Sequence, residues 1–333
     1  MKLLYLPNEP VLGWQVGARD ALRALTDLHV YSFLQQSPAR ALAEIEQLVD
    51  TVRPDAILFT KSEGLPISDR WLRRLRANAR IIYYDGDVYG RVFKRLPAQA
   101  RTLSRHADLV LLCAMGANAR RFRAAGARRI AYLPHNASEL QFGASWTPTR
   151  ERELDVVLVG NRIRGRFALQ ERVPFARMPG VFEREELVRR LAAAFGARFA
   201  VYGTGWDGFA GARGPVEFAR QHEVLRRAWL SVGFDHFPNE PLYFSDRLPI
   251  ALMSGVAHAV HYHPGYDTMF RDGEHLLWAH SVGALVDVAR DALAKGPEAL
   301  DALGARGRLH AERTLTSRVV FARAVAEIAR LCS

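Results

Sequence analysis

The sequence predicts an α/β protein of two doubly wound domains, each built on a parallel sheet with helices on both faces. Short apolar runs alternate with stretches of helical periodicity along the 333 residues, which is the pattern of βαβ units. At roughly 150 residues per domain, this length favours two domains. The hydrophobic period disappears between residues 134 and 153, and this interruption predicts a connecting segment.

Apolar runs in the first half predict six strands. They lie at residues 2–6, 28–33, 56–60, 80–84, 109–113 and 130–133. The clearest helix between them spans residues 69–78, where Trp71, Leu72 and Leu75 form one stripe and four arginines occupy the remainder.

The second half repeats the alternation. Strands are expected at residues 154–159, 199–202, 230–234, 256–261 and 276–278, and helices at 184–195, 222–228, 245–253 and 282–294. We therefore expect an N-terminal Rossmann-like domain at residues 1–145, a second Rossmann-like domain at 146–315, and a C-terminal helix within 316–333 that packs back across both. In such sheets ligands bind beyond the carboxyl ends of the strands.

The charge of the chain is uneven. The 46 Lys+Arg residues exceed the 35 Asp+Glu residues by 11, and only four of the basic residues are lysines. Residues 1–150 carry 22 basic and 13 acidic side chains, whereas residues 151–333 carry 24 and 22. A basic first half can attract nucleic acid, anionic lipid or an acidic glycan, and biased arginine usage is the alternative explanation.

Two features indicate a cytoplasmic protein. Cys113 and Cys332 are far apart and lack the spacing of a zinc site or a disulfide framework. The apolar N-terminus is interrupted by Pro7 before it reaches the length of a signal peptide, and no apolar run reaches about 18 residues. Peripheral contact with the inner face of the membrane remains open.

The most informative turn follows the strand at residues 154–159. Gly160 and Asn161 allow close backbone approach, and Arg162 and Arg164 supply forked donors suited to phosphate oxygens. The turn is neither a Walker loop nor a dinucleotide fingerprint, so nucleoside triphosphate hydrolysis and ordinary dinucleotide binding lose support. The pattern predicts a diphosphate cradle, with a solvated surface loop as the alternative.

Two further segments follow the same logic. Gly203, Gly205 and Trp206 end a strand, where they could read a base edge or form a tight turn around a buried indole. Asp246 and Arg247 open a helix, where Arg247 could meet an anion or form a surface ion pair.

The ordered series of segments resembles GT-B glycosyltransferases, especially the CgeB-like, spore-maturation branch related to glycosyltransferase family 4. That branch shows a "DVVFVG" strand, a "YGxGW" turn, an "SDRLFEALACG" helix, a "GxxxLFxDGxE" loop and a final segment rich in Thr and Arg. The corresponding residues are 155–160, 202–206, 245–255, 265–274 and 312–318, and further matches lie at 54–58, 83–87 and 132–134. The resemblance covers most of the chain and implies two domains that face a central cleft.

The resemblance implies hexosyl or pentosyl transfer from a nucleotide-diphosphate sugar to an acceptor hydroxyl, with no metal ion or additional cofactor. Arg162, Arg164 and Arg247 would stabilise the departing phosphate. Gly160, Asn161, Gly203, Gly205, Trp206 and Asp246 complete the expected donor site. One position departs from the family: the Glu assigned to the nucleotide ribose is Ile250 here, and Glu240 and Asp246 are the nearest carboxylates that could replace it.

The expected catalytic candidates are Asp85, Asp87, Arg247 and His263. Asp85 and Asp87 follow the strand at residues 80–84, where one of them could accept the proton of the acceptor hydroxyl or orient that hydroxyl; a solvated turn with a helix cap is the alternative. Although this pair has the form of a metal clamp, we expect no metal. His263 lies near the loop that holds the donor sugar in the family, although a lone histidine is more often structural.

Weaker candidates line two more loops of the first half, at Glu9, Gly13 and residues 61–64. Arg73, Arg74 and Arg76 are the expected contacts for an acidic acceptor, which could be a cell-surface glycan, a lipid-linked acceptor or modified DNA, or for a membrane. Two other functions remain open. A nucleotide-sugar epimerase would need paired acid/base residues around the donor, and a non-catalytic basic protein with a degenerate donor site would explain Ile250. The oligomeric state is not specified by the sequence.

Overall fold

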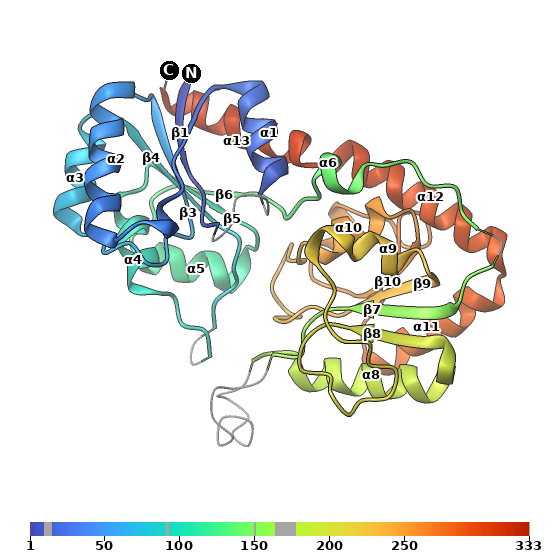
Figure 1. The fold of residues 1–333 in the computed structure, drawn as a ribbon. Helices are drawn as coiled ribbons and strands as arrows, with labels where there is room; N and C mark the ends of the chain where they lie inside the picture. Colours follow the sequence, from blue (N-terminus) through green and yellow to red (C-terminus); the bar gives the residue numbers. More distant parts are fainter. Residues whose placement is uncertain (10–14, 91–92, 150, 164–177, 333) are drawn as a thin grey trace. The chain divides into compact units, whose positions relative to one another are not determined.

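A computed structural model describes residues 1–9, 15–90, 93–149, 151–163 and 178–332. It divides into two compact units, Met1–Pro134 with Ser317–Ser333, and His135–Thr316. Each unit is an α/β domain on a fully parallel sheet, with strand order β2-β1-β3-β4-β5-β6 in the first and β11-β10-β9-β7-β8 in the second (Figure 1). The predicted fold class is confirmed.

In the first unit, helices cover both faces of the six-stranded sheet (Figure 1). The strands are β1 (Lys2–Leu6), β2 (Asp27–Val30), β3 (Ala56–Thr60), β4 (Arg80–Asp85), β5 (Leu109–Leu112) and β6 (Ile130–Tyr132). One apolar core packs α2 (Pro38–Val52), α3 (Asp69–Arg76), α4 (Ala98–His106) and α5 (Gly116–Ala124) on one face. A second core packs α1 (Val16–Leu25) and α13 (Ser317–Cys332) on the other face.

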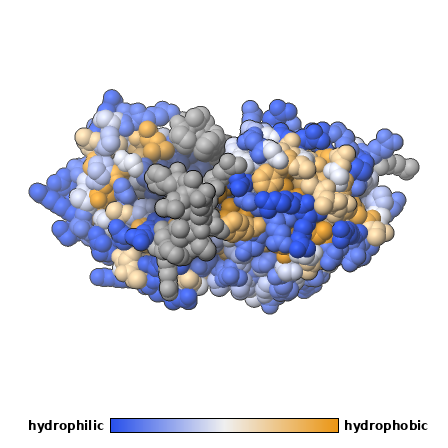
Figure 2. Space-filling view, turned by 90° about the horizontal axis from the view of Figure 1, so that it is seen from below, coloured by the Kyte–Doolittle hydropathy of each residue, from blue (hydrophilic) through white to orange (hydrophobic). Residues whose placement is uncertain are grey.

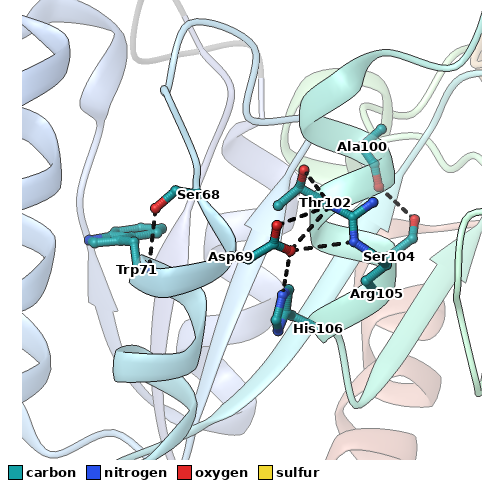
Figure 3. Close-up of polar contacts among 8 residues, drawn as sticks. All are labelled: Ser68, Asp69, Trp71, Ala100, Thr102, Ser104, Arg105 and His106. Carbon is teal, nitrogen blue, oxygen red and sulfur yellow. Dashed lines mark hydrogen bonds and ion pairs between the residues drawn. The ribbon is translucent and has the colours of Figure 1, made fainter.

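Helix α3 shows why its sequence forms a helix at this place. The Ser68 hydroxyl accepts a hydrogen bond from the Trp71 N–H and caps the first turn. Asp69 then joins α3 to α4, because its carboxylate lies 2.7 Å from His106 Nε2 and 3.2 Å from Arg105 Nη2 (Figure 3). Trp71, Leu72 and Leu75 are buried, as the predicted stripe requires.

The second unit has the same layered design. Its strands are β7 (Leu154–Val159), β8 (Phe199–Tyr202), β9 (Ala228–Gly233), β10 (Ala257–His261) and β11 (Leu277–Ala279). One face packs against α8 (Val181–Phe195), α11 (Val282–Ala294) and α12 (Pro297–Thr314). The opposite face packs against α9 (Gln221–Leu225), α10 (Arg247–Met253) and Phe142 of the short helix α6 (Glu139–Phe142) (Figure 1).

The division between units lies at Pro134, at the start of the expected connecting segment (residues 134–153) and before the expected domain boundary at residue 145. Two contacts explain the position. The Ala137 N–H donates to the Leu315 carbonyl over 3.0 Å, and the Phe142 ring lies 5.7 Å from the Phe218 ring, so the residues after 134 are part of the second unit. Helix α13 packs into the core of the first unit through Val320, Phe321, Ala324 and Ile328.

Several element bounds differ from those expected. β2 ends at Val30, because Phe33 begins a short 3-10 helix and inserts into the core. α10 begins at Arg247, two residues after the expected start. α12 was not expected, because glycines and charged residues interrupt its apolar stripe. It packs closely by means of those glycines: a Cβ built on Gly304 would lie 2.1 Å from the Gly255 carbonyl oxygen.

Replacing Gly304 with Ala should therefore lower the free energy of unfolding by about 2 kcal/mol or more, because a packed helix must move to admit one methyl group. Gly283→Ala is the matched control. Its Cβ would meet only Arg190 Nη1, at 3.6 Å, so stability should stay level or rise by up to about 1 kcal/mol. Urea unfolding followed by circular dichroism compares the two, and equal stabilities would contradict the close approach of α12.

Candidate functional site

In the second unit, the carboxyl ends of β7, β8, β9 and β10 gather most of the candidates. Gly160 follows β7, Gly203 follows β8, Asp235 lies just after β9, and His263 lies just after β10. Arg247 opens α10. Since ligands of parallel α/β sheets bind beyond the carboxyl ends of the strands, this edge is where a nucleotide is expected.

The glycine-containing turns after β7 and β8 pack closely against each other. Gly203 has a φ of +142°, and a Cβ on it would lie 2.4 Å from the Gly160 carbonyl oxygen. Trp206, 1% exposed, donates its indole N–H to that same oxygen over 2.7 Å, and the Asn161 side chain accepts from the Thr204 N–H over 2.9 Å. The tight turn around a buried indole is thus what the structure contains. Gly205, whose Cβ would lie 2.6 Å from the Arg162 carbonyl oxygen, belongs to the same packing.

Arg162 points away from the turn that was expected to bind phosphate. Its guanidinium lies 2.6 Å from the Glu185 carboxylate on α8, and its side chain is 13% exposed. Glu185 also pairs with Arg189 at 3.2 Å. In this arrangement Arg162 is neutralised within the protein. Arg164 lies outside the described residues.

A buried arginine that the sequence did not single out lies beneath the turn. Arg184 on α8 is 2% exposed, and its guanidinium donates to the carbonyls of Asn161 and Phe234, each over 2.8 Å, and lies 3.0 Å from His236 Nε2. Within the described chain, no carboxylate lies within ion-pair distance of it. Burial and the nearby Arg247 lower the pKa of Arg184 to about 9. No sequence signal marks it, because it is one charge in a charged stretch of α8.

Arg247 is held by one carboxylate. Its Nη2 donates to Asp235 Oδ1 over 2.8 Å, while the Ser245 N–H donates to the other oxygen over 3.0 Å. Burial alone would raise the pKa of Asp235, but Arg247, together with His263 and Arg184, outweighs it and holds that pKa well below its usual range. The Arg247 side chain is 29% exposed, so part of it faces solvent.

The two guanidinium groups converge on Gly160. The position of a Cβ at Gly160 lies 3.5 Å from Arg247 Nε and 3.7 Å from Arg184 Nη1. Among the described residues, Asp235 is the single carboxylate in ion-pair contact with either group. Asp246 precedes Arg247 and its charge acts on it, but the two form no direct pair. Two cations at a strand end, of which only Arg247 is paired with a carboxylate, can accept an anion.

Neutral histidines surround this pair of cations. His263 is 1% exposed and stacks on Tyr266 with centroids 5.2 Å apart, and neither ring nitrogen has a hydrogen-bond partner among the described residues. Burial lowers the pKa of His263 to about 4 and that of His258 to about 4. His263 is therefore uncharged at neutral pH. One of its ring nitrogens can then accept a hydrogen bond and the other can donate one, but the ring carries no acidic second proton.

A small cavity lies beside Arg247 and Asp235. Ser231, His258 and His261 also line it, and its volume is about 20 Å³, enough for one water molecule. Ile250, where the resemblance would place a ribose-binding Glu, is fully buried in the apolar core. A nucleotide would therefore lie on the solvent side of Arg247.

In the first unit, Asp85 and Asp87 occupy different environments. Asp85 is fully buried and accepts hydrogen bonds from the Tyr83 hydroxyl (2.6 Å), the Tyr89 hydroxyl (2.9 Å) and the Asp87 N–H (2.9 Å). Burial, followed by the charge of Asp87, raises the pKa of Asp85 to about 6. No helix begins at this turn. Asp85 is thus an enclosed support for Asp87.

Asp87 is the accessible member of the pair, with a side chain that is 24% exposed. Lys61 Nζ lies 2.7 Å from one carboxylate oxygen and Lys94 Nζ 2.8 Å from the other. Burial would raise the pKa of Asp87, but the two lysines outweigh it and lower that pKa. Asp87 is consequently a weak base and a good hydrogen-bond acceptor. Gly13, another loop candidate of this unit, lies outside the described residues.

The described residues have two further properties, which concern metal ions and membranes. They contain no group of three or more His, Cys, Asp or Glu side chains arranged to hold a metal ion. No helix in the described part of the chain is long and apolar enough to cross a membrane. The face shown in Figure 2 is mainly hydrophilic, interrupted by hydrophobic patches.

The buried histidines should make the protein less stable in acid. The pKa is lowered to about 3 for His236 and to about 4 for His258 and His263, against about 6.5 in an unfolded chain. As the pH falls from about 6.5 to 4, these histidines bind protons in the unfolded chain but not in the folded chain. Each histidine should then remove about 1.4 kcal/mol of unfolding free energy per pH unit. Asp85 acts in the opposite direction between about pH 6 and 4, because its folded-state pKa is raised.

His263→Phe tests this dependence, because it keeps the ring stack and removes a titrating group with no hydrogen-bond partner. The slope of unfolding free energy against pH should fall by up to about 1.4 kcal/mol per pH unit. His29→Gln, at a side chain that is 39% exposed, should change it less. Urea unfolding at pH 7, 6 and 5 measures the slopes. A stability that does not vary over this range would contradict the assignment of neutral buried histidines.

Comparison with known proteins supports the fold and finds a family match within the second half of the chain. Residues 177–326 match the protein family described as "Glycosyl transferase-like", a range that includes Arg184, Asp235 and Arg247 but not the Gly160 turn. No curated protein matches the sequence. The branch and family 4 relationship expected from the sequence stay a prediction.

Solved structures match the whole chain at low sequence identity. HepE from Anabaena, in complex with UDP-glucose, is 11% identical with a TM-score of 0.63, over 99% of this chain and all of that one. Sucrose-phosphate synthase from Thermosynechococcus elongatus is 12% identical with a TM-score of 0.65, over 99% of this chain and 98% of that one. An α,α-trehalose-phosphate synthase from Burkholderia vietnamiensis is 11% identical with a TM-score of 0.63, over 99% and 98%. The chain therefore has the GT-B fold, and its residues 177–326 match the glycosyl transferase-like family model.

Proposed function

We propose that the protein is a glycosyltransferase that moves a hexosyl or pentosyl unit from a nucleotide-diphosphate sugar to an acceptor hydroxyl. One observation carries the proposal: Arg184 and Arg247 converge on the Gly160 turn, and among the described residues only Arg247 is in ion-pair contact with a carboxylate, that of Asp235. These three charged residues lie in the region that matches the glycosyl transferase-like family. HepE was solved with UDP-glucose and with UDP, so UDP-glucose is the first donor to test.

The two arginines have different tasks in this proposal. Arg247, which is partly exposed, donates hydrogen bonds to the diphosphate, and these strengthen as the leaving group gains negative charge. Arg184, enclosed and bonded to carbonyls, adds a fixed positive potential that water does not screen. Asp235 orients the Arg247 guanidinium. The positive charge that stabilises the departing diphosphate then comes from side chains, and we propose a metal-independent reaction.

The residues proposed to bind the ribose and the donor sugar are chosen by their place beside Arg247 and after β10. Asp246, beside Arg247 and partly exposed, is the carboxylate we propose for the ribose hydroxyls, because Ile250 is in the core. His263, neutral and without a hydrogen-bond partner among the described residues, is proposed as an acceptor for a hydroxyl of the donor sugar. Asn161, Gly160, Gly203, Gly205 and Trp206 shape the turn around the diphosphate.

The first unit is proposed to receive the acceptor. The two lysines that lower the pKa of Asp87 favour an orienting role for this carboxylate over proton removal. Asp85, which has no exposed surface, supports Asp87.

The surplus of positive charge has a definite location. Residues 88–138 contain ten Lys or Arg residues and one acidic residue, Asp108. Two of the four arginines of α3 are paired, Arg74 with Glu46 and Arg76 with Asp108. A second set of exposed arginines forms no ion pair within the part of the chain that the structure describes: Arg101, Arg120, Arg123, Arg128 and Arg129. We propose that this set, rather than α3, attracts an acidic acceptor or an anionic surface at the inner face of the membrane.

The alternative functions have less support. An epimerase needs an acid/base pair around the donor sugar, and Asp235, the carboxylate that contacts Arg247, is held in that ion pair. A non-catalytic protein with a degenerate donor site would bind a nucleotide sugar without turnover, so transfer or hydrolysis of the donor excludes it.

Arg247→Ala should weaken UDP-glucose binding by about 10- to 100-fold, the value of one or two charge-assisted hydrogen bonds. Because this change leaves Asp235 without its partner, Arg247→Lys is the second variant, and it should show an intermediate loss. Arg290→Ala removes an exposed arginine that pairs with Asp287 at 3.1 Å, and it should bind donor normally. Titration calorimetry measures the affinities. Wild-type affinity in both Arg247 variants would remove Arg247 from the site.

Changing Arg120, Arg123, Arg128 and Arg129 together to Gln should weaken binding to phosphatidylglycerol vesicles at least tenfold at low salt, because each basic residue near such a surface contributes about 1 kcal/mol. A control with the same charge change replaces four exposed, carboxylate-paired arginines of the second unit: Arg190, Arg220, Arg271 and Arg290.

The control variant of the second unit should still bind the vesicles. Added salt should weaken vesicle binding by every variant. Vesicle sedimentation measures the effect, with double-stranded DNA as a second probe. Equal losses in the two variants would mean that net charge, not this surface, is responsible. Tighter binding to DNA than to vesicles would favour the DNA acceptor.

A further inference from the structure

Lysine is rare in this chain, and two of the four lysines meet at one carboxylate. The other 42 basic residues are arginines. Lys61 Nζ and Lys94 Nζ each contact a different oxygen of Asp87, at 2.7 and 2.8 Å. An ammonium is a compact charge with three donors in a tetrahedral arrangement, whereas a guanidinium is a planar fork, so the two are not interchangeable at such a point. The two ammonium groups at Asp87 therefore offer a geometry that two guanidinium groups would not reproduce.

The backbone that carries these lysines is strained. Lys61 has a φ of +55°, Ser62 of +45° and Lys94 of +51°. Six non-glycine residues in the described ranges have positive φ, and these three belong to one cluster. Left-handed backbone is unfavourable for residues with a Cβ, and such strain concentrates at ligand-binding positions.

The carboxylate between the lysines has rigid support. The Asp87 N–H donates to Asp85 Oδ1 over 2.9 Å, and the Asn118 side-chain amide donates to the Asp87 carbonyl over 3.5 Å. Asp85 is in turn fixed by the Tyr83 and Tyr89 hydroxyls. Its charge is enclosed and satisfied by three donors. The two ammonium groups are thus held at defined positions rather than on mobile side chains.

The cluster is open to a ligand. The side chains of Lys61 and Lys94 are 36% and 31% exposed, and each ammonium has two N–H donors besides the one directed at Asp87. The cluster lies at the carboxyl edge of the sheet, after β3 and β4. Two buried polar atoms near the end of β3, Ser62 Oγ and Asn8 Oδ1, have no hydrogen-bond partner among the described residues. These donors and acceptors suit a polar, negatively charged group.

We propose that Lys61 and Lys94 bind an oxyanion group of the acceptor, either a carboxylate or a phosphate, and so select an acidic acceptor. This assignment rests on the proposed glycosyltransferase function. The ammonium groups bridge the oxyanion as they bridge Asp87, and Asp87 then lies beside the bound group, where it accepts a hydrogen bond from a neighbouring hydroxyl. The surplus arginines of residues 88–138 raise the local concentration of such an acceptor.

The small number of lysines makes a direct test possible. Full-length protein labelled with lysine carrying ¹³C at Cε should give four lysine signals, each assigned by a single Lys→Arg variant. Titration with inorganic phosphate and with glucuronate should shift the Lys61 and Lys94 signals to saturation and leave those of Lys2 and Lys295 in place. Glucose and potassium chloride serve as neutral and simple-salt controls. A response to phosphate but not glucuronate identifies a phosphorylated acceptor, and the reverse identifies a uronate acceptor.

Parallel shifts of all four lysines, or shifts that chloride reproduces, would show ionic screening only and would overturn the proposal. Lys61→Met and Lys94→Met should each weaken binding of the responding anion at least tenfold, and Lys295→Met should not. Because loss of a lysine leaves Asp87 less paired, Lys61→Arg and Lys94→Arg provide a second pair that keeps the charge. They should bind the anion more weakly than wild type, and wild-type affinity in both would contradict the need for lysine.

Donor binding separates this proposal from the one on which it rests. UDP-glucose affinity should be unchanged in Lys61→Met and Lys94→Met, because the donor residues lie in the second unit. If the wild type binds and turns over UDP-glucose while neither phosphate nor glucuronate shifts the Lys61 and Lys94 signals, only the assignment of the acceptor site fails. If the lysines respond but no nucleotide sugar binds, the anion site stands and its assignment to a sugar acceptor is overturned.

Discussion

The candidate donor site depends on the hydrogen bonds made by the buried guanidinium of Arg184. It donates to the carbonyls of Asn161 and Phe234, and it thereby joins the turn after β7 to the end of β9. Asp235 is the next residue, and its carboxylate orients Arg247. A charge buried without such bonds would be strongly destabilising. The bonds that satisfy Arg184 therefore also determine where Gly160, Asp235 and Arg247 lie.

The first unit uses the same design with the opposite charge. Asp85 is fully buried and accepts three hydrogen bonds, one of which fixes the backbone of Asp87. Asp87 in turn positions Lys61 and Lys94. In both units an enclosed, fully bonded charge supports a charged group that solvent can reach. This arrangement limits the reorganisation needed when a ligand binds, because the supporting charges are already in place.

Fold and chemistry carry different weight in the functional conclusion. Identities of 11 to 12% with HepE and the two synthases establish the GT-B fold alone. Donor binding is argued from Arg184, Arg247 and Asp235, and acceptor selection from the two lysines. Since one fold supports many activities, the residues and not the architecture decide what the protein does.

Local patterns in the sequence were sufficient for the two parallel-sheet domains, because apolar runs such as 2–6, 56–60 and 154–159 coincide with β1, β3 and β7. They also placed Gly160 and Arg247 at strand and helix ends. Only the tertiary structure decided what each polar group contacts. Arg162 turns to Glu185, Trp206 is buried, and Arg184 lies under the site. The reason is physical: periodicity reports burial along one element, whereas a partner is set by residues that are distant in sequence, as Phe234 is from Arg184.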